Sequence, residues 1–585
     1  MPSKEPKSKI GLNIFLLKYN LESATKIWEK REYLTQSSGS GEDDGVAKHR
    51  ELPFESGGVA GTLLIKHPPS ENTPDWVYFI NDGLDNETTD QLKNKSVSAL
   101  LVLKIKDRQF VLAFGHGRHM LEHSCIDTRF GVKVCLNSIE PGRIASIDKQ
   151  TFDANPRLTR TQATKISSIS AYGVNPDQDL LKAVVGITQK AYSGDLGDVV
   201  AGMDSLQISV SADMASVERA IITALSRAES SDYLKKIDGK ESQFAWVNNL
   251  THETDDAKLR ELNDDLWFNF RSLNFYKMWL AAPEIIDWSN LSGFSYWPIT
   301  EETIFSQFIE ISDFRKTFNK NSSLSTLRSR KIYYQRSSDK SYGSYPAFSC
   351  VYWETRLGND NYILHQGNWY KINPDFAKAT DDAYKKIPEK VPSSAFPEYD
   401  HADEGDYNLA VSSQTRLAYT LLDKKLIRFG GGPSSIEVCD LLRHATSASR
   451  GELIHVKRGR ESASLSHLFN QGLVSCTLLA SAPEFVKEVN EQLRSRKRRQ
   501  VPIKFPCSDY DLVYAIIDGP STSPPSDIPF FSKISLLSSI RTLTAYGFNA
   551  YLMRIHESAS FLAKKAAKKK AKKAAKTAKN KTAVN

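Results

Sequence analysis

The stretch SIEVCDLLRHATSASRGELIHVKRGRESASLSHLFNQGLVSCTLL, residues 435–479, decides the fold of the carboxy-terminal part of the chain. The residues Ile436–Leu442 are largely apolar and contain Asp440, which predicts a buried strand that places this acid at its end. After a turn, Glu452–Lys457 predicts a second strand that ends at a lysine. Apolar residues at helical spacing then predict an amphipathic helix over residues 463–479. An acid and a lysine are thereby expected on neighbouring strands.

This order of elements resembles the core of PD-(D/E)XK nucleases, which presents a metal-binding acid beside a catalytic lysine. Because alternate side chains of a strand share a face, Leu453, His455 and Lys457 are expected to lie together. Glu452 then faces the other way and is badly placed to act as an acid of the site. We expect His455 and Lys457 to point toward Asp440. The departure from the nuclease pattern is His455, which stands where that pattern has Asp or Glu.

The same resemblance implies two accessory residues, Gln471 on the following helix and Glu404 from an earlier helix. Asp440 and Glu404 would hold Mg²⁺ through hard oxygen ligands, and Lys457 would stabilise the attacking hydroxide or the developing charge. Imidazole is a poor ligand for Mg²⁺, so His455 would suit Mn²⁺ or act as a base. The predicted catalytic residues are Asp440, His455, Lys457 and Gln471, the predicted metal ligands are Glu404 and Asp440, and the predicted cofactor is Mg²⁺ or Mn²⁺.

A site with one Asp and a His-x-Lys sequence is either a variant of the nuclease site or a degenerate one. The first hypothesis is a metal-dependent nuclease that cleaves DNA or RNA. The second is a nuclease-like core without activity, which serves as a nucleic-acid-binding sensor or adaptor. A third hypothesis is a scaffold of a toxin–antitoxin or modification complex. The sequence leaves enzymatic activity, the oligomeric state and the trigger open.

Length and composition predict a multidomain α+β protein. The 585 residues are 40% apolar, 25% charged and 10% aromatic, which is typical of a folded protein with more than one core. There is no apolar run of about 18 residues, so no transmembrane helix and no membrane partner are expected. The six cysteines are scattered without a CxxC pair, which favours reduced thiols in the cytoplasm over disulfides.

The positive net charge belongs to the carboxy-terminal tail. Residues 561–585 contain ten lysines and no acid, so the first 560 residues are near −2 although the whole chain is at +8. Without an apolar stripe, and with like charges repelling, the tail is expected to be disordered. It is interpreted as binding nucleic acid through its phosphates, or alternatively as a solubilising tail. The candidate nucleic-acid-binding residues are Lys564, Lys565, Lys568, Lys569 and Lys570.

A second basic run, RSRKRR at residues 494–499, follows the next predicted helix. Its cations form a candidate contact to a nucleic-acid backbone, and the alternative is a solvated helix end. The residues concerned are Arg494, Arg496, Lys497, Arg498 and Arg499.

Four regions are predicted along the chain. They are a β-rich amino-terminal domain (1–155), a mixed α+β middle domain (156–385), a restriction-endonuclease-like α/β core (402–557) and a basic disordered tail (558–585). The Pro- and acid-rich segment at 385–406 is predicted to be the linker that precedes the third region.

Blocks spread over the chain resemble a sporadically distributed bacterial family of unknown function that occurs on mobile islands near restriction and anti-phage systems. The blocks are FVLAFGHGRHML (110–121), RFGVKVCLNSI (129–139), IEVCDLL (436–442), IHVKR (454–458), LSHLFNQG (465–472), VYAIID (513–518) and PFFSKISLLSSIRTLTAYGF (529–548). The resemblance implies a defence role in a bacterial cytoplasm and a partner protein of a defence system. It extends to about residue 556 and supplies no catalytic residues, and the tail lies outside it.

Overall fold

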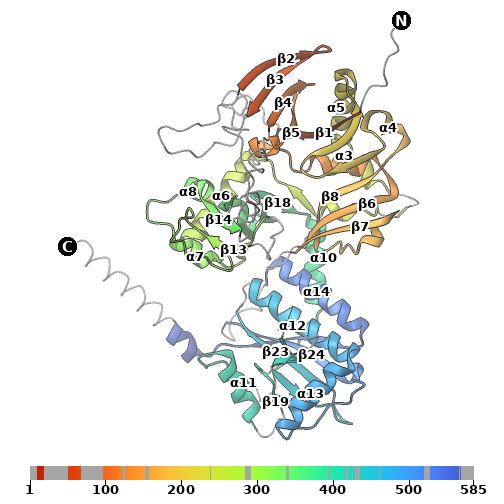
Figure 1. Ribbon diagram of the computed structural model, residues 1–585. Helices are drawn as coiled ribbons and strands as arrows, with labels where there is room; N and C mark the ends of the chain where they lie inside the picture. The colour runs from red at the N-terminus through yellow and green to blue at the C-terminus, as the bar shows by residue number, and fades with distance from the viewer. Residues whose placement is uncertain are drawn as a thin grey trace, which may run out of the picture.

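The computed structural model has three folded parts that follow one another along the chain (Figure 1). It describes residues 9–18, 50–66, 97–121, 125–151, 157–236, 239–240, 242–283, 291–336, 342–392, 396–414, 419–424, 426–428, 435–459, 462–519, 528–565 and 567. Helices and several sheets of antiparallel strands occur together, which confirms the predicted α+β class. No helix within the described ranges is long and apolar enough to cross a membrane.

The first part is a ten-stranded antiparallel sheet, called here the amino-terminal sheet, with the order β2-β3-β4-β5-β1-β10-β9-β8-β6-β7. The strands are β1 (Lys9–Leu16), β2 (Arg50–Ser56), β3 (Val59–Lys66), β4 (Ser98–Ile105), β5 (Arg108–Gly115), β6 (Ile139–Thr151), β7 (Leu158–Ser167), β8 (Asp179–Thr188), β9 (Val199–Gly202) and β10 (Leu206–Ser211). Strand β1 lies in the interior of the sheet, between β5 and β10.

Helices α3 (Phe130–Ser138) and α5 (Met214–Glu229) share one apolar core with the amino-terminal sheet. The domain boundary predicted at residue 155 is wrong, because β6 and β7 on either side of it pair with each other. The antiparallel pairing continues through β8 to β10, so the sheet ends only at Ser211. Composition changes near residue 156, but strand pairing does not follow composition.

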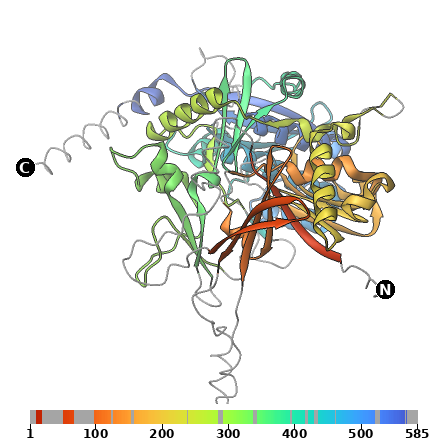
Figure 2. The same ribbon diagram turned by 90° about the horizontal axis from the view of Figure 1, so that it is seen from above.

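The second part, called here the middle part, combines a five-stranded antiparallel sheet (β11-β18-β17-β16-β12) with a three-stranded one (β13-β14-β15). The strands are β11 (Leu250–His252), β12 (Met278–Leu280), β13 (Leu291–Ser295), β14 (Lys331–Arg336), β15 (Tyr342–Pro346), β16 (Val351–Leu357), β17 (Asp360–His365) and β18 (Asn368–Ile372). The helices are α6 (Asp256–Arg271), α7 (Ile311–Lys316), α8 (Leu324–Ser329), α9 (Ala347–Cys350) and α10 (Pro374–Lys385). In Figure 2 the middle part lies beside the amino-terminal sheet.

The third part, the carboxy-terminal domain, is built on a mixed sheet with the order β19-β22-β23-β24-β25. Its elements are α11 (Glu404–Ser413), β19 (Thr420–Leu421), β22 (Leu441–Arg443), β23 (Gly451–Arg458), α12 (Ser462–Ser481), α13 (Pro483–Ser495), β24 (Tyr510–Ile517), α14 (Phe530–Ala545) and β25 (Asn549–Ile555). Strand β22 is antiparallel to β23, and β23, β24 and β25 are parallel. Both faces are covered, by α12, α13 and α14 on one side and α11 on the other.

The predicted strand over residues 436–442 is two short strands. Strand β21 (Ser435–Glu437) pairs with β20 (Leu426–Arg428) in a separate two-stranded sheet, while β22 joins the main sheet. The chain bends over residues 438–440, so the alternation of faces that an extended strand requires is broken before Asp440. The acid stands at the start of β22 and not at the end of a central strand.

The segment predicted to be a linker, residues 385–406, packs on the carboxy-terminal domain over its described residues. Glu389 forms a parallel bridge with Leu552, and Tyr399 forms one with Glu557. The ring of Tyr399 is fully buried. The domain therefore begins near residue 386 and not at 402, because apolar side chains between the prolines are buried against its sheet.

Helix α14 connects the carboxy-terminal domain to the other two parts (Figure 1). Phe530 and Phe531 share an apolar cluster with Leu180 of β8 and with residues of β17, β18 and α10. The buried carboxylate of Glu354 on β16 accepts hydrogen bonds from the amides of Phe530 (2.7 Å) and Phe531 (3.3 Å). An acid from the middle part thus satisfies the free amides at the start of a helix of another domain.

The beginning of the predicted disordered tail is folded. Residues 559–565 are helical, and the ring of Phe561 packs 5.0 Å from that of Tyr399. Lys564 forms an ion pair with Asp400 (3.0 Å), and Lys565 forms one with Glu557 (3.2 Å). The prediction is wrong for this segment because its single aromatic residue finds an apolar contact. Lys568, Lys569 and Lys570 lie outside the described residues.

Candidate metal centre

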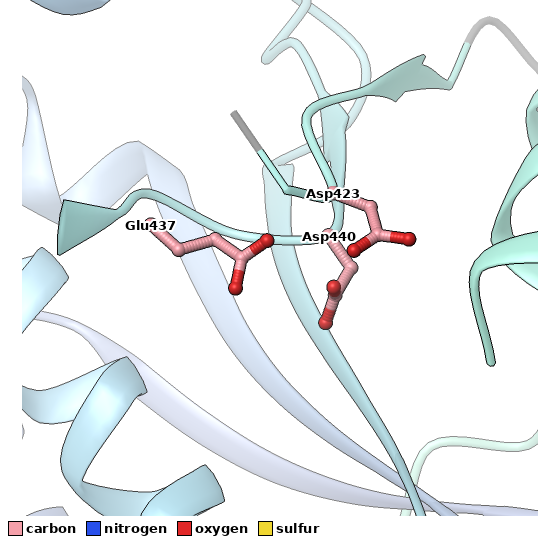
Figure 3. Close-up of side chains that lie close together, drawn as sticks. All are labelled: Asp423, Glu437 and Asp440. Atoms are coloured by element: carbon pink, nitrogen blue, oxygen red, sulfur yellow. The ribbon is translucent and has the colours of Figure 1, made fainter. Parts of the chain in front are cut away.

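Three carboxylates meet beside the bend before β22. Asp423, Glu437 and Asp440 each offer an oxygen atom, and these atoms lie within 4.8 Å of one another. Figure 3 shows the three side chains: Glu437 and Asp440 come from one short segment, and Asp423 comes from the segment beside it. We call this set the acidic cluster. Carboxylate oxygens at this spacing are the ligands that hard divalent cations use in proteins, so the residues present fit a metal ion.

Backbone hydrogen bonds hold the segments of the acidic cluster together. The amides of Leu422 and Asp423 donate to the carbonyl of Asp440 (2.8 and 3.1 Å), and the amide of Lys424 donates to the carboxylate of Glu437. The amide of Asp440 donates to the carbonyl of Ile454 on β23 (2.9 Å). The cluster is therefore fixed to both neighbouring strands by the main chain.

The carboxylate of Asp440 lies across the carboxyl end of β23. Its Oδ2 atom accepts a hydrogen bond from the amide of Val456 at 2.6 Å, and the residue is 9% exposed. Burial raises the pKa of Asp440 well above its usual range, against the Val456 hydrogen bond, which lowers it. The negative charges of Glu437, Asp423 and Glu404 raise it further.

Glu437 is held in a similar way. Burial raises its pKa, and the charge of Asp423 adds to this effect. The Lys424 amide, the charge of Lys457 and a hydrogen bond from Gln471 Nε2 (3.2 Å) act in the opposite direction. Among the described residues, no lysine or arginine forms an ion pair with any member of the acidic cluster. The three acids therefore repel one another, and the charge of Lys457 offsets this repulsion only in part, at Glu437, so a bound divalent cation would relieve it further.

Lys457 and Glu404 form an ion pair at the end of β23. The distance from Lys457 Nζ to Glu404 Oε2 is 3.0 Å, and the side chains are 28% and 30% exposed. The other carboxylate oxygen of Glu404 accepts the amide of Arg458 at 3.0 Å. Glu404 is the first residue of α11, with Asp403 capping that helix. The structure therefore places Glu404 on the lysine and outside the group of three oxygens, instead of among the ligands as predicted.

His455 does not belong to the acidic cluster. Its ring is 1% exposed, with Nε2 3.5 Å from Ser475 Oγ of α12 and its centroid 6.4 Å from that of Tyr514. Burial lowers the pKa of His455 to about 3, so the imidazole is neutral at physiological pH and a very weak base. Strand parity correctly gives it the same face as Lys457, but that face is covered by α12 at this position, and the predicted catalytic role lacks support.

Two of the three acids in the cluster, Asp423 and Glu437, are residues that the sequence did not single out. On one continuous strand over residues 436–442, Glu437 would face away from Asp440, and Asp423 lies in an ordinary LDKK sequence. The bend over residues 438–440 brings Glu437 and Asp440 to one side. Gln471 contacts Glu437, and its catalytic role stays a prediction.

Glu452, at the other end of β23, has a different environment. Its carboxylate is paired with Lys390 and with Arg443 (3.0 Å) and accepts a hydrogen bond from Tyr419 (2.7 Å). Burial opposes its ionisation, but these three partners outweigh burial and lower the pKa of Glu452 to about 2. The prediction that Glu452 is badly placed to serve the site is consistent with this arrangement.

The predicted basic run lies at the end of α13 and beyond it. Arg496 is half-buried and donates to the carbonyl of Leu421 (2.8 Å), two residues before Asp423. Arg494 donates to Gln500 (3.3 Å), and Arg499 donates to the carbonyl of Ala445 (3.3 Å). The exposed residues of the run are Arg494, Lys497, Arg498 and Arg499. One member of the run thus supports the loop of the acidic cluster, and the others face solvent.

Comparison with known proteins identifies a family for the chain. A model described as "Family of unknown function (DUF6119)" matches residues 12–556. The chain belongs to this family. No curated protein and no solved structure matches it. The DUF6119 match includes the acidic cluster, Lys457 and Glu404 and ends before most of the Lys/Ala tail, so the predicted membership of a family of unknown function is confirmed. The association with mobile islands and the nuclease resemblance stay predictions.

Proposed function

We propose that the carboxy-terminal domain is a metal-dependent nuclease with a PD-(D/E)XK-like site. The observation on which this rests is the position of Lys457, at the end of a strand whose amide at Val456 binds the carboxylate of Asp440. The acid that His455 replaces in the motif is supplied by Glu437, with Asp423 as a third ligand. Hard oxygen ligands favour Mg²⁺ or Mn²⁺.

A cation bound to the acidic cluster would polarise a phosphate and lower the pKa of a bound water. The residues of the chain would do the rest. Lys457 presents a positive charge beside the carboxylates, where it would stabilise the negative charge that develops on the phosphate. Glu404 orients Lys457 through their ion pair. Gln471 restrains the carboxylate of Glu437.

The biological setting is proposed from the resemblance of the sequence blocks to a family on defence islands. In this setting the nuclease would act on DNA or RNA in a bacterial cytoplasm, with a partner protein of a defence system. The amino-terminal sheet would sense the trigger. A cell-based test is protection from phage by the wild-type chain and its loss with Asp440→Asn.

The second candidate function is a nucleic-acid-binding adaptor without catalysis. The specific observation that favours it is His455, which occupies the motif position of an acid and is buried away from the acidic cluster. The two candidates differ in whether phosphodiester bonds break when metal is supplied.

The deciding experiment incubates the purified full chain with single- and double-stranded DNA and RNA in the presence of EDTA, Mg²⁺ or Mn²⁺. We expect cleavage that requires metal and falls by about 10²-fold or more in Asp440→Asn and Lys457→Ala. Glu488→Gln and Lys487→Ala are matched controls, since both residues are exposed on α13 of the same domain. The absence of cleavage under every condition, or equal cleavage by the Asp440 and Lys457 variants, would refute the nuclease assignment.

A further inference from the structure

A cavity of about 570 Å³ lies between the amino-terminal sheet and the middle part. One wall comes from β6, β7 and β8, and the opposite wall comes from β15, α9 and the turn between β17 and β18. Ligand pockets typically measure roughly 300–1,000 Å³, so the cavity has the size for a nucleotide. None of its lining residues belongs to the carboxy-terminal domain. The cavity is therefore separate from the acidic cluster.

Cations predominate among the charged residues of the cavity. Two acids line it, Asp148 and Asp204. The cations that line it are Arg118, Arg129, Lys149, Arg160 and Lys182. A concave site with this excess of positive charge favours anionic ligands.

Three of these cations already have carboxylate partners. The ion pairs are Arg118–Asp204 (3.0 Å), Arg160–Asp148 (2.6 Å) and Lys149–Asp179 (2.8 Å). In these three pairs the carboxylate neutralises the positive charge of its partner. The surplus lies on the other two cations.

Arg129 and Lys182 are half-buried and have no ion-pair partner among the residues that the structure describes. One guanidinium nitrogen of Arg129 donates to the carbonyl of Val247 at 3.4 Å, and another is buried without a hydrogen-bond acceptor. The ammonium group of Lys182 donates to the side-chain oxygen of Gln366. Both side chains thus have donors left for a ligand.

The two cations also influence each other. Burial lowers the pKa of Lys182 to about 8, and the charge of Arg129 lowers it further, while Asp204 acts in the opposite direction. Like charges in a partly dry cavity repel, and a bound anion between them would remove that repulsion. An arginine and a lysine together suit a phosphate group, which the guanidinium binds in a bidentate manner.

The uncharged lining of the cavity is part polar and part apolar. Leu180, Leu181, Met203, Tyr345 and Tyr370 contribute to its lining. Tyr345 and Tyr370 offer aromatic rings to a flat group, and the leucines and Met203 offer aliphatic surface. A ligand that matches both regions has a charged end and an uncharged, flat or apolar body.

We propose that this cavity binds a small phosphate-bearing molecule with the chemistry of a nucleotide, its phosphate held by Arg129 and Lys182. The proposal does not rest on the nuclease assignment. It gives the amino-terminal sheet and the middle part a ligand of their own, independent of a metal.

The test is calorimetric titration of the full chain with ATP, AMP, inorganic phosphate and adenosine in EDTA, so that the acidic cluster cannot take part through a metal. We expect ATP or AMP to bind with one site per chain, and adenosine to bind at least about tenfold more weakly, because a charge-assisted hydrogen bond is lost. Equal binding of adenosine and AMP, or no binding of ATP, AMP and phosphate, would overturn the proposal.

Two substitutions locate the site. Arg129→Gln and Lys182→Gln are each expected to weaken nucleotide binding by about tenfold. Arg219→Gln and Lys104→Gln are matched controls, because these side chains are 59% and 68% exposed, and they should leave binding unchanged. Undiminished binding in both cavity variants contradicts the proposal. Should either variant fail to fold, an azido analogue of ATP cross-linked to the wild-type chain is expected on peptides of β8 or β18, and a cross-link elsewhere also contradicts it.

Discussion

The two ends of strand β23 carry acids in opposite electrostatic situations. At the amino end, Glu452 is enclosed by two cations and a tyrosine hydroxyl, and its pKa is lowered to about 2. At the carboxyl end, Asp440 is equally buried, but other carboxylates surround it and its pKa is raised. We call Glu452 compensated, because cations pair with its charge, and Asp440 uncompensated, because none does among the described residues. The eight residues of β23 separate the two.

The difference in ion pairing distinguishes Glu452, which stabilises the fold, from the acidic cluster, which is suited to bind a cation. A buried carboxylate with complete partners has no reason to bind anything else. Buried carboxylates held together by the main chain, without a cation, cost stability and are found where a site requires them. The comparison therefore supports the acidic cluster as the functional end of β23, and each prediction below perturbs one of the two ends.

The largest effect is expected at the compensated end. Glu452→Gln removes the charge that Lys390 and Arg443 share, leaving Arg443 without its carboxylate partner and Lys390 with Asp511 alone (3.1 Å). We expect a loss of about 3 kcal/mol in the free energy of unfolding, measured by chemical denaturation in the presence of EDTA. Glu488→Gln on α13 is the control and should stay within about 0.5 kcal/mol of the wild type. An unchanged free energy of unfolding in Glu452→Gln would show that the ion pairs of Glu452 do not stabilise the fold.

The same residue predicts a dependence on pH. The pKa of Glu452 in the folded chain, about 2, is below that of an unfolded glutamate, about 4.3. Its contribution to stability is therefore complete above the unfolded value and is lost as pH falls from about 4.3 toward 2. The stability difference between the wild type and Glu452→Gln should shrink over this window.

The second prediction concerns the metal affinity of the uncompensated end. Glu437→Gln keeps the shape of the side chain but removes a charged ligand of the acidic cluster. We expect at least about a tenfold weaker affinity for Mn²⁺ in calorimetric titration. Glu488→Gln on α13 serves as the control, since it removes an exposed carboxylate of the same domain without touching the cluster. Equal affinity in wild type and Glu437→Gln would remove Glu437 from the ligands.

The sequence predicted the carboxy-terminal elements well because their apolar periodicity is strong. Strand β23 and the long helix α12 follow from alternation and helical spacing. The acidic cluster was predicted only through Asp440. Glu437 and Asp423 were missed because the bend over residues 438–440 changes which side chains share a face, and a bend depends on tertiary hydrogen bonds.

Domain limits were less predictable for a related reason. The change in composition near residue 155 falls between two strands of one sheet, and strand pairing is a long-range property. The proline-rich segment before Glu404 looks like a linker in composition, yet Tyr399 is buried. The nature of the partner surface, and not the local sequence, decides whether such a segment packs.

The third prediction tests whether the uncompensated end costs stability. Asp440→Asn keeps an acceptor for the Val456 amide but removes a charge whose burial raises the pKa. Because the folded pKa is raised, the ionised wild type loses stability as pH rises through the range between the unfolded and folded values. In EDTA near neutral pH the variant should therefore be more stable than the wild type, as measured by chemical denaturation.

Metal reverses the order in this third experiment. Mn²⁺ should raise the melting temperature of the wild type and leave that of Asp440→Asn nearly unchanged. A destabilised variant in EDTA would show that the acidic cluster is compensated by groups beyond the described residues, and the comparison with Glu452 would fail.

The smallest effect is expected at the basic run. Substitutions there test whether a nucleic-acid backbone approaches the domain near the carboxyl end of β23. Lys497 and Arg498 are exposed, whereas Arg496 supports the loop before Asp423 and is left intact. For double-stranded DNA, replacing both exposed cations with glutamine should lower the slope of log affinity against log salt by about 0.9 for each phosphate that the variant no longer neutralises. Lys487→Gln, exposed on α13, is the matched control and should keep the wild-type slope. An unchanged slope in the double variant would assign the run to solvent, with nucleic acid reaching β23 from another side.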